Sequence, residues 1–197
     1  MQKMRNFIIS CFGQKSNLGF TLIELMVVFS LMTILSGVGI ASFVNYSRSQ
    51  AVDNSLKELR TTIYTARSRA LSQLKTGTCG ATGSNLQLIG YQVVLCSVPG
   101  HTHPSGIACN DNNNAYELQI VCANSGGSGQ TSETTLAKKF LDPNITFSNT
   151  STATYFFFAT ITAAVTTDAS SGNSPKAIVT GYSLNKSVSV SQTGVIQ

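Results

Sequence analysis

Residues 25–47 form the longest apolar run in the chain and contain no charged side chain. Glu24 and Arg48 bound this run of 23 residues. A helix needs about 20 apolar residues to cross a bilayer. The pattern therefore predicts a membrane-spanning helical segment with a single carboxylate, Glu24, at its start. A charge within such a segment is costly and needs a partner, and the run itself supplies none.

A second pattern follows the run, because apolar residues now recur every three or four positions. This spacing forms one stripe along an amphipathic helix. The stripe comprises Val52, Leu56, Leu59, Ile63, Ala66, Ala70 and Leu74 (or Leu71). No proline interrupts this part of the chain, and Gly77 and Gly80 follow it directly. The sequence predicts one helix from about Thr21 to about Lys75 that ends at these glycines.

Strand patterns and turn-forming residues make up the remainder of the chain. The expected strands cover residues 86–96, 116–122, 145–147, 155–158, 177–180 and 187–191, the last two as an antiparallel pair. They are rich in β-branched and aromatic residues, and the intervening segments are rich in Gly, Pro, Asn and Asp. One long helix followed only by strands predicts an α+β fold, with the helix packed on one face of an antiparallel sheet.

The formal net charge of +5 is unevenly distributed. Residues 1–19 contain Lys3, Arg5 and Lys15 and no acid, whereas residues 76–197 contain four lysines and five acids. A broad basic face for nucleic acid is not expected from this balance. The positive-inside rule predicts a cytoplasmic N-terminus, with everything after about residue 47 across the membrane. A cleaved secretory signal peptide is the competing interpretation, but the apolar run is too long for one.

Cysteine usage fits an oxidising compartment. Cys11 precedes the apolar run, and Cys79, Cys96, Cys109 and Cys122 follow it. Four cysteines allow three connectivities, of which we favour Cys79–Cys96 with Cys109–Cys122. A zinc site is the alternative, because His101 and His103 fall between Cys96 and Cys109. The spacings lack the C-x2-C pair that is typical of zinc sites.

Other polar clusters give weaker indications of chemistry. Arg60, Arg67 and Arg69 are candidate contacts for an anionic ligand, although such charges more often form the solvated face of a helix. Residues 111–114 could begin a calcium loop, but the full ligand spacing is absent. No nucleophile with a base and no phosphate-binding loop is recognisable. The sequence therefore predicts neither an enzyme nor a bound cofactor.

The segment Gly19-Phe20-Thr21-Leu22-Ile23-Glu24-Leu25 resembles the class III signal peptide of type IV pilins and type II secretion pseudopilins. The resemblance implies that a prepilin peptidase cleaves after Gly19, that the new N-terminal Phe20 is methylated, and that Glu24 guides assembly. It implies a removed leader (1–19), a transmembrane and filament-core helix half (20–47), an amphipathic half (48–75) and an extracytoplasmic β-rich domain (76–197). The protein would be a single-pass inner-membrane protein with a periplasmic C-terminal domain.

Two further motifs resemble the GspH/FimT group of minor pilins and pseudopilins. One is Leu59-x6-Ala66-Arg67-Ser68-x-Ala70, and the other is the ending Val188-Ser-Val-Ser-Gln-Thr-Gly-Val195. The group implies a low-abundance subunit that initiates or caps a filament, at its tip or base. Its partners would be other minor and major pilins or pseudopilins, prepilin peptidase and the inner-membrane assembly platform. The 19-residue leader and the arginine-bearing helix favour a pilus over a secretion pseudopilus.

Some members of this group bind DNA for natural transformation through arginines around the C-terminal glycine. Here that stretch is Thr193-Gly194-Val195-Ile196-Gln197 and contains no arginine. DNA binding is therefore the alternative function, and assembly is the favoured one.

Overall fold

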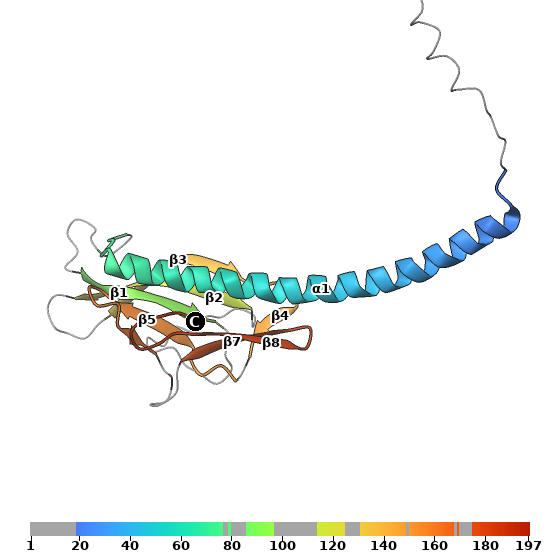
Figure 1. The fold of residues 1–197 in the computed structure, drawn as a ribbon. Coiled ribbons are helices and arrows are strands. Elements are labelled where there is room, and N and C mark those ends of the chain that lie inside the picture. Colours follow the sequence, from blue (N-terminus) through green and yellow to red (C-terminus); the bar gives the residue numbers. More distant parts are fainter. Residues whose placement is uncertain are drawn as a thin grey trace, which may run out of the picture. The chain divides into compact units, whose positions relative to one another are not determined.

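The computed structural model contains one long helix and eight strands among its described residues. It describes residues 19–76, 79, 86–96, 114–124, 131–148, 150–167, 169 and 175–197, except for the side chains of Val38, Ala41, Asn124, Thr131 and Ser132. The chain divides into two compact units, Met1–Asn45 and Tyr46–Gln197. Helix α1 (Leu22–Leu71) contributes to both units (Figure 1). Residues 1–18 of the leader, the two histidines, Cys109 and residues 111–113 of the suggested calcium loop lie outside the described residues.

The second half of α1 buries the predicted apolar stripe. Five of its residues have no exposed surface: Val52, Leu59, Ile63, Ala66 and Ala70. Ser55 and Thr62 are also buried on this face, and the Thr62 hydroxyl donates to the carbonyl of Glu58 one turn earlier. The prediction is wrong at the end of the stripe, because Leu71 and Leu74 are 48% and 47% exposed. The buried face ends with Ala70.

The helix ends at Leu71, about one turn before the predicted Lys75. The N–H of Gln73 donates to the carbonyl of Ala70, and the N–H of Leu74 donates to that of Arg69. Gln73 has a φ of 50°, so these bonds form a Schellman motif with a left-handed residue at its centre. Glycine usually occupies that position. The expected stop at Gly77 and Gly80 is wrong because Gln73 takes the left-handed conformation first.

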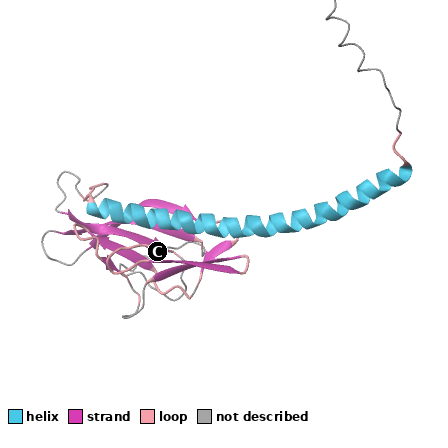
Figure 2. Ribbon diagram, viewed as in Figure 1, coloured by secondary structure: helices cyan, strands magenta, loops and turns pink. Residues whose placement is uncertain are grey.

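The strands form two antiparallel sheets (Figure 2). The five-stranded sheet has the order β3 (Thr131–Phe140), β2 (Ala115–Asn124), β1 (Leu86–Leu95), β5 (Tyr155–Ala159) and β6 (Val165–Thr166). The three-stranded sheet has the order β4 (Ile145–Phe147), β7 (Lys176–Gly181) and β8 (Leu184–Ser189). The α+β architecture is confirmed, with the long helix packed on antiparallel strands, and so is the predicted C-terminal antiparallel pair.

The core lies between the buried stripe of α1 and the two sheets. Alternate residues of each strand point into it, as the period of two requires. They include Tyr91 and Val93 on β1, Tyr116, Leu118 and Ile120 on β2, Phe156 and Phe158 on β5, and Val179 and Val188 on the second sheet. The rings of Tyr116 and Phe147 meet edge to face with centroids 6.3 Å apart. This contact joins the two sheets.

Strand β3 was not predicted from the sequence. Its residues, TSETTLAKKF, are mostly polar, and several are poor strand formers. The strand forms because it pairs along its whole length with β2, and it lies at the edge of its sheet. Pairing with a neighbour therefore decides its conformation, and intrinsic propensity does not.

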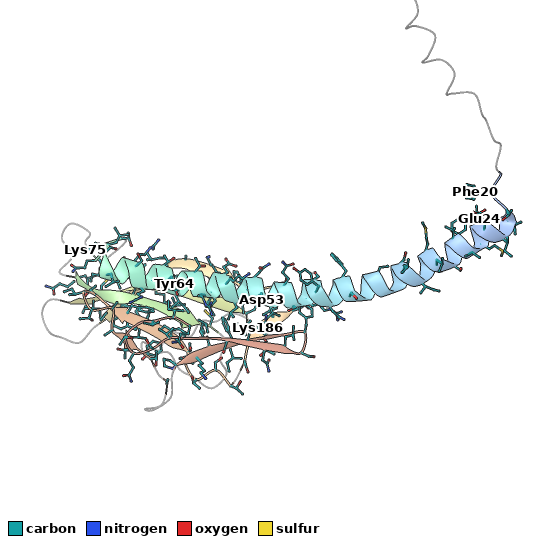
Figure 3. All side chains as sticks on the ribbon, in the orientation of Figure 1. Phe20, Glu24, Asp53, Tyr64, Lys75 and Lys186 are labelled. Carbon is teal, nitrogen blue, oxygen red and sulfur yellow. A yellow bond between two sulfur atoms is a disulfide. The ribbon has the colours of Figure 1, made fainter. Side chains whose placement is uncertain are left out.

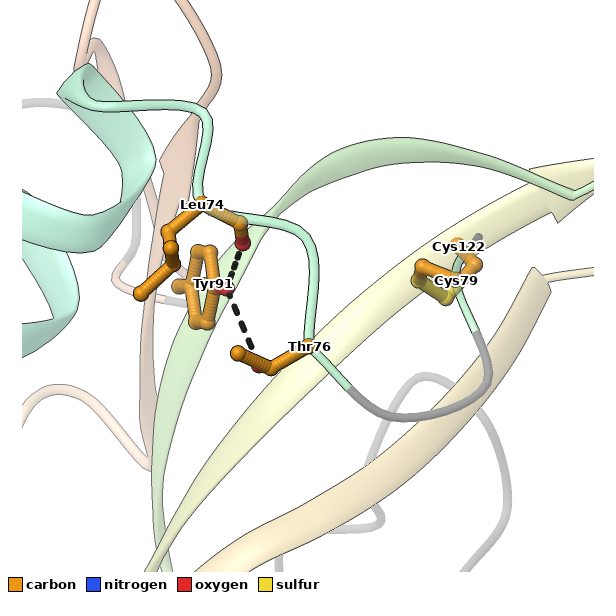
Figure 4. Close-up of a disulfide and its surroundings, with 5 residues drawn as sticks. All are labelled: Leu74, Thr76, Cys79, Tyr91 and Cys122. Carbon is orange, nitrogen blue, oxygen red and sulfur yellow. Dashed lines mark hydrogen bonds between the residues drawn. A yellow bond between two sulfur atoms is a disulfide. The ribbon is translucent and has the colours of Figure 1, made fainter. Parts of the chain in front are cut away.

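The predicted disulfide pairing is wrong. Cys79, just after the helix, is bonded to Cys122 on β2, with Cα atoms 5.8 Å apart (Figure 4). Cys96 is also disulfide-bonded, and so is not available as a zinc ligand. The same region is held by Tyr91, whose hydroxyl donates to the carbonyl of Leu74. The chain leaving the helix is thus fixed across β1 and β2, which sequence spacing alone could not indicate.

Tyr116 is a large polar side chain that is fully buried in the core beneath the helix. Burial raises the pKa of its phenol to about 12, the neighbouring Thr62 hydroxyl lowers it slightly, and Glu58 raises it further. The folded-state pKa is therefore above the unfolded value of about 10. The stability that depends on the neutral phenol is complete below pH 10 and is lost as the pH rises toward 12.

We expect Tyr116→Phe to reduce the loss of stability at high pH. Between pH 8 and pH 11 the wild type should lose about 1 kcal/mol more unfolding free energy than the variant, because only the wild type must ionise a buried phenol. Urea unfolding of the full chain in detergent micelles measures this difference. Tyr46→Phe is the control, because Tyr46 is 64% exposed. Equal losses of unfolding free energy in the wild type and both variants would contradict the raised pKa of Tyr116.

Candidate processing and assembly site

The helix begins immediately after the predicted cleavage point. The hydroxyl oxygen of Thr21 accepts a hydrogen bond from the N–H of Glu24 at 3.3 Å, and the N–H of Leu25 donates to the carbonyl of Thr21 at 3.2 Å. Thr21 is therefore the N-cap, and Glu24 is three residues later, as in a capping box. Cleavage after Gly19 would leave Phe20 as a single residue before the cap. Figure 3 shows Phe20 and Glu24 at this end of the helix.

The first half of α1 presents apolar side chains to its surroundings. Phe20, Leu22 and Ile23 are 78%, 77% and 71% exposed, and the large apolar residues that follow are also exposed. The helix is long and apolar enough to cross a membrane, and none of its most apolar 18-residue window is buried within the chain. These side chains therefore need a covering of lipid or of other subunits.

Two polar side chains in this half form hydrogen bonds within the helix. The Ser30 hydroxyl donates to the carbonyl of Val27, and the Thr33 hydroxyl donates to that of Ser30, each at 2.8 Å. Such internal bonds suit an environment without water. Glu24 differs, because it is the only charged residue between Lys15 and Arg48. A counter-charge for it must come from the new N-terminus or from another molecule.

The family comparison covers the same part of the chain. A family model for the prokaryotic N-terminal methylation motif matches residues 14–40. This match spans the predicted cleavage point, the helix start and most of the apolar run. The motif and the long N-terminal helix together identify a type IV pilin-like protein. No curated protein and no solved structure matches the chain.

The motif also indicates how the chain is processed and assembled. A type IV pilin-like protein is processed by prepilin peptidase and assembles with other pilins. The apolar helix and the motif are consistent with a single-pass, membrane-anchored pilin. Gly19, Phe20 and Glu24 were predicted from the sequence, but the capping role of Thr21 was not. The Thr-x-x-Glu spacing could have indicated its capping role.

The structure does not bring the three candidate arginines together. Arg60 and Arg67 are nearly two full turns apart and lie on one side of the buried stripe, whereas Arg69 lies on the other side. Arg69 instead lines an open groove with Thr61, Tyr64, Thr65, Ser68 and Ser72. The Nε atoms of Arg60 and Arg67 are buried and have no hydrogen-bond partner among the described residues.

The C-terminal segment packs against the same side of the helix as Arg67. Gly194 has a φ of 78°, and a Cβ there would lie 3.1 Å from Nε of Arg67 and 3.0 Å from the carbonyl oxygen of Ala163. The Tyr64 hydroxyl donates to the carbonyl of Ile196 at 3.4 Å. Only glycine fits this turn without strain. Residues 59–70 of the helix and the C-terminal Gly194 turn, separate in the sequence, therefore meet in the fold.

Proposed function

We propose that this protein is a minor pilin or pseudopilin that helps to initiate or cap a filament. Its role is non-catalytic, and its partners are other minor and major pilins or pseudopilins and the inner-membrane assembly platform. The observation that carries the proposal is the lone carboxylate of Glu24 on a helix half whose apolar surface is not covered by its own chain. Before assembly, the helix anchors the subunit in the inner membrane with its C-terminal domain in the periplasm.

Pairing between subunits accounts for the position of Glu24. Cleavage after Gly19 exposes an amine on Phe20, which can carry the positive charge that the apolar run lacks. The amine of a neighbouring subunit would neutralise Glu24 in a low-dielectric setting, where an unpaired charge costs several kcal/mol. Assembly then removes an energetic penalty that a single subunit retains in lipid.

The C-terminal unit supports a minor rather than a bulk role. The two motifs that resemble the GspH/FimT group, Leu59 to Ala70 and Val188 to Val195, lie against each other at Arg67 and Gly194. Their meeting in space supports the view that the two motifs form one surface of the kind found in that group, and that the resemblance is not due to chance. We favour a pilus over a secretion pseudopilus on the leader length and the arginine-bearing helix, and the neighbouring genes would decide between them.

We expect Glu24→Gln to reduce incorporation into filaments at least tenfold, which corresponds to about 1.4 kcal/mol. Glutamine serves as well as glutamate at the third position of a capping box, so the helix start is preserved while the charge is lost. The measurement is the ratio of this protein in sheared or cross-linked filament fractions to that in membranes of the native host. Glu24→Asp should retain most incorporation, because it keeps the charge.

Ser30→Ala is the matched control, since it removes a polar group from the same helix half without changing its charge. It should assemble as the wild type does. Normal incorporation of Glu24→Gln, with leader cleavage intact, would show that Glu24 acts only as a capping residue and would overturn the pairing argument.

DNA binding is a second candidate because of one contact. The C-terminal segment has no arginine, but Arg67 from the helix lies beside Gly194 and supplies a guanidinium there. This role predicts salt-sensitive gel shifts at micromolar full-length protein in micelles, weakened by Arg67→Gln. The absence of a shift at low salt would leave assembly as the function of this surface.

A further inference from the structure

The hairpin that joins β7 to β8 places an aromatic ring at its tip. Gly181 pairs with Leu184, so Tyr182 and Ser183 form a two-residue turn. Both have positive φ values, 52° and 64°, as a type I′ turn requires. Asn-Gly is the favoured pair in such turns, and the left-handed conformation costs another residue about 1–2 kcal/mol. The turn therefore holds a tyrosine where folding alone would favour asparagine.

Two contacts fix this tip to the beginning of the helix in the Tyr46–Gln197 unit. The guanidinium carbon of Arg48 lies 5.5 Å from the centre of the Tyr182 ring. Asp53, one and a half turns further along, forms an ion pair with Lys186 on β8 (Figure 3). Tyr182 and Leu184 nevertheless each remain 37% exposed. The tip is held in place while an aromatic and an aliphatic side chain remain available.

The position of Arg48 in the sequence sets the level of this tip relative to a bilayer. Arg48 is the first charged residue after Glu24. At about 1.5 Å per residue, the 24 intervening steps span about 36 Å of helix, slightly more than a hydrocarbon core of about 30 Å. Arg48, and the ring stacked on it, are therefore expected at the outer headgroup layer.

Tyrosine and arginine are the side chains that suit this layer. Tyr has an apolar ring and a polar hydroxyl and is enriched at membrane–water interfaces, where arginine also extends its charge toward phosphates. Tyr46 is 64% exposed two residues before Arg48 and adds a second ring. Because Lys186 is paired with Asp53, Arg48 gives the patch a net positive charge, which favours anionic lipid.

We propose that the Tyr182–Leu184 tip, together with Arg48, docks into the outer headgroup layer of the membrane that anchors the subunit. This contact supports the C-terminal unit on the lipid surface until the subunit enters a filament. The inference rests on the membrane anchoring in the proposed function. A neighbouring subunit is the competing occupant of the same tip.

The chain contains no tryptophan, so one introduced indole reports its own environment. The processed full chain carrying Tyr182→Trp is reconstituted into vesicles of phosphatidylcholine and phosphatidylglycerol. Lipids brominated at a shallow acyl position should quench its fluorescence at least twofold more strongly than deeply brominated lipids. Leu184→Trp, on the same tip, should give the same depth profile and serves if Tyr182→Trp does not fold.

Ile161→Trp is the matched control, because Ile161 is 72% exposed and lies two residues from Ala163, which contacts the Gly194 turn beside Arg67. Arg67 is about 28 Å further along the helix than Arg48, so this indole should not be quenched. Phe29→Trp, within the apolar run, reports anchoring and should be quenched by deep bromines.

Quenching in Phe29→Trp without quenching in either tip variant would overturn the docking proposal and leave the anchor intact. A lack of quenching in Phe29→Trp would overturn the anchor and the docking proposal together. Tip quenching that appears only at high protein-to-lipid ratios would assign the tip to a neighbouring subunit instead. Tip quenching that is independent of this ratio and is weakened by Arg48→Gln is the result that we expect.

Discussion

A single carboxylate on an otherwise uncharged apolar helix is the constraint on which the rest of this structure depends. Glu24 follows the helix cap, and the large apolar side chains around it are exposed. Neither lipid nor water suits both features, because lipid disfavours the charge and water disfavours the apolar surface. An assembly of such helices satisfies both, provided that each carboxylate meets a cationic group. The methylation motif spans residues 14–40. In the proposed processing, Phe20, four positions before Glu24, supplies such an amine.

The second half of the same helix is packed against its own domain. Its buried face, from Val52 to Ala70, is covered by strands of its own chain, so this half belongs to a domain with a core. Partly exposed ion pairs, Asp53–Lys186 and Glu58–Lys139, flank that face and link strands β8 and β3 to the helix. One half of the helix is thus packed within its own domain, and the apolar surface of the other half is not covered by its own chain. This arrangement suits a subunit that folds by itself and buries the rest of its apolar surface when it assembles with other subunits.

Much of this organisation could be predicted from the sequence, because the deciding signals are local. The uncharged run, the apolar stripe and the β-branched segments each have a period that physical chemistry links to one conformation. Features that depend on partners distant in the sequence could not be predicted. Polar β3 is a strand only because β2 lies beside it, and Cys79 reaches Cys122 only because the chain turns back after Gln73. Gln73 itself takes a conformation that favours glycine, so the glycine signal misplaced the end of the helix.

In the candidate site, too, some residues could be predicted from a local motif and others only from the fold. Gly19, Phe20 and Glu24 were predicted because their spacing is a linear motif, and the family match over residues 14–40 includes all three. The arginines were grouped from sequence proximity, but the rotation of the helix separates Arg69 from Arg60 and Arg67. The contacts of Arg67 with the Gly194 turn and of Arg48 with Tyr182 join residues over 120 positions apart, so only the fold reveals them.

Intact-mass spectrometry of protein extracted from the membrane of its native host tests the central claim most directly. The account predicts a chain that begins at Phe20, carries one methyl group on its amine, and has lost residues 1–19. Only such a chain presents the charged N-terminus that Glu24 requires. A native chain that retains Met1 would contradict the account, because no amine would then lie near the carboxylate.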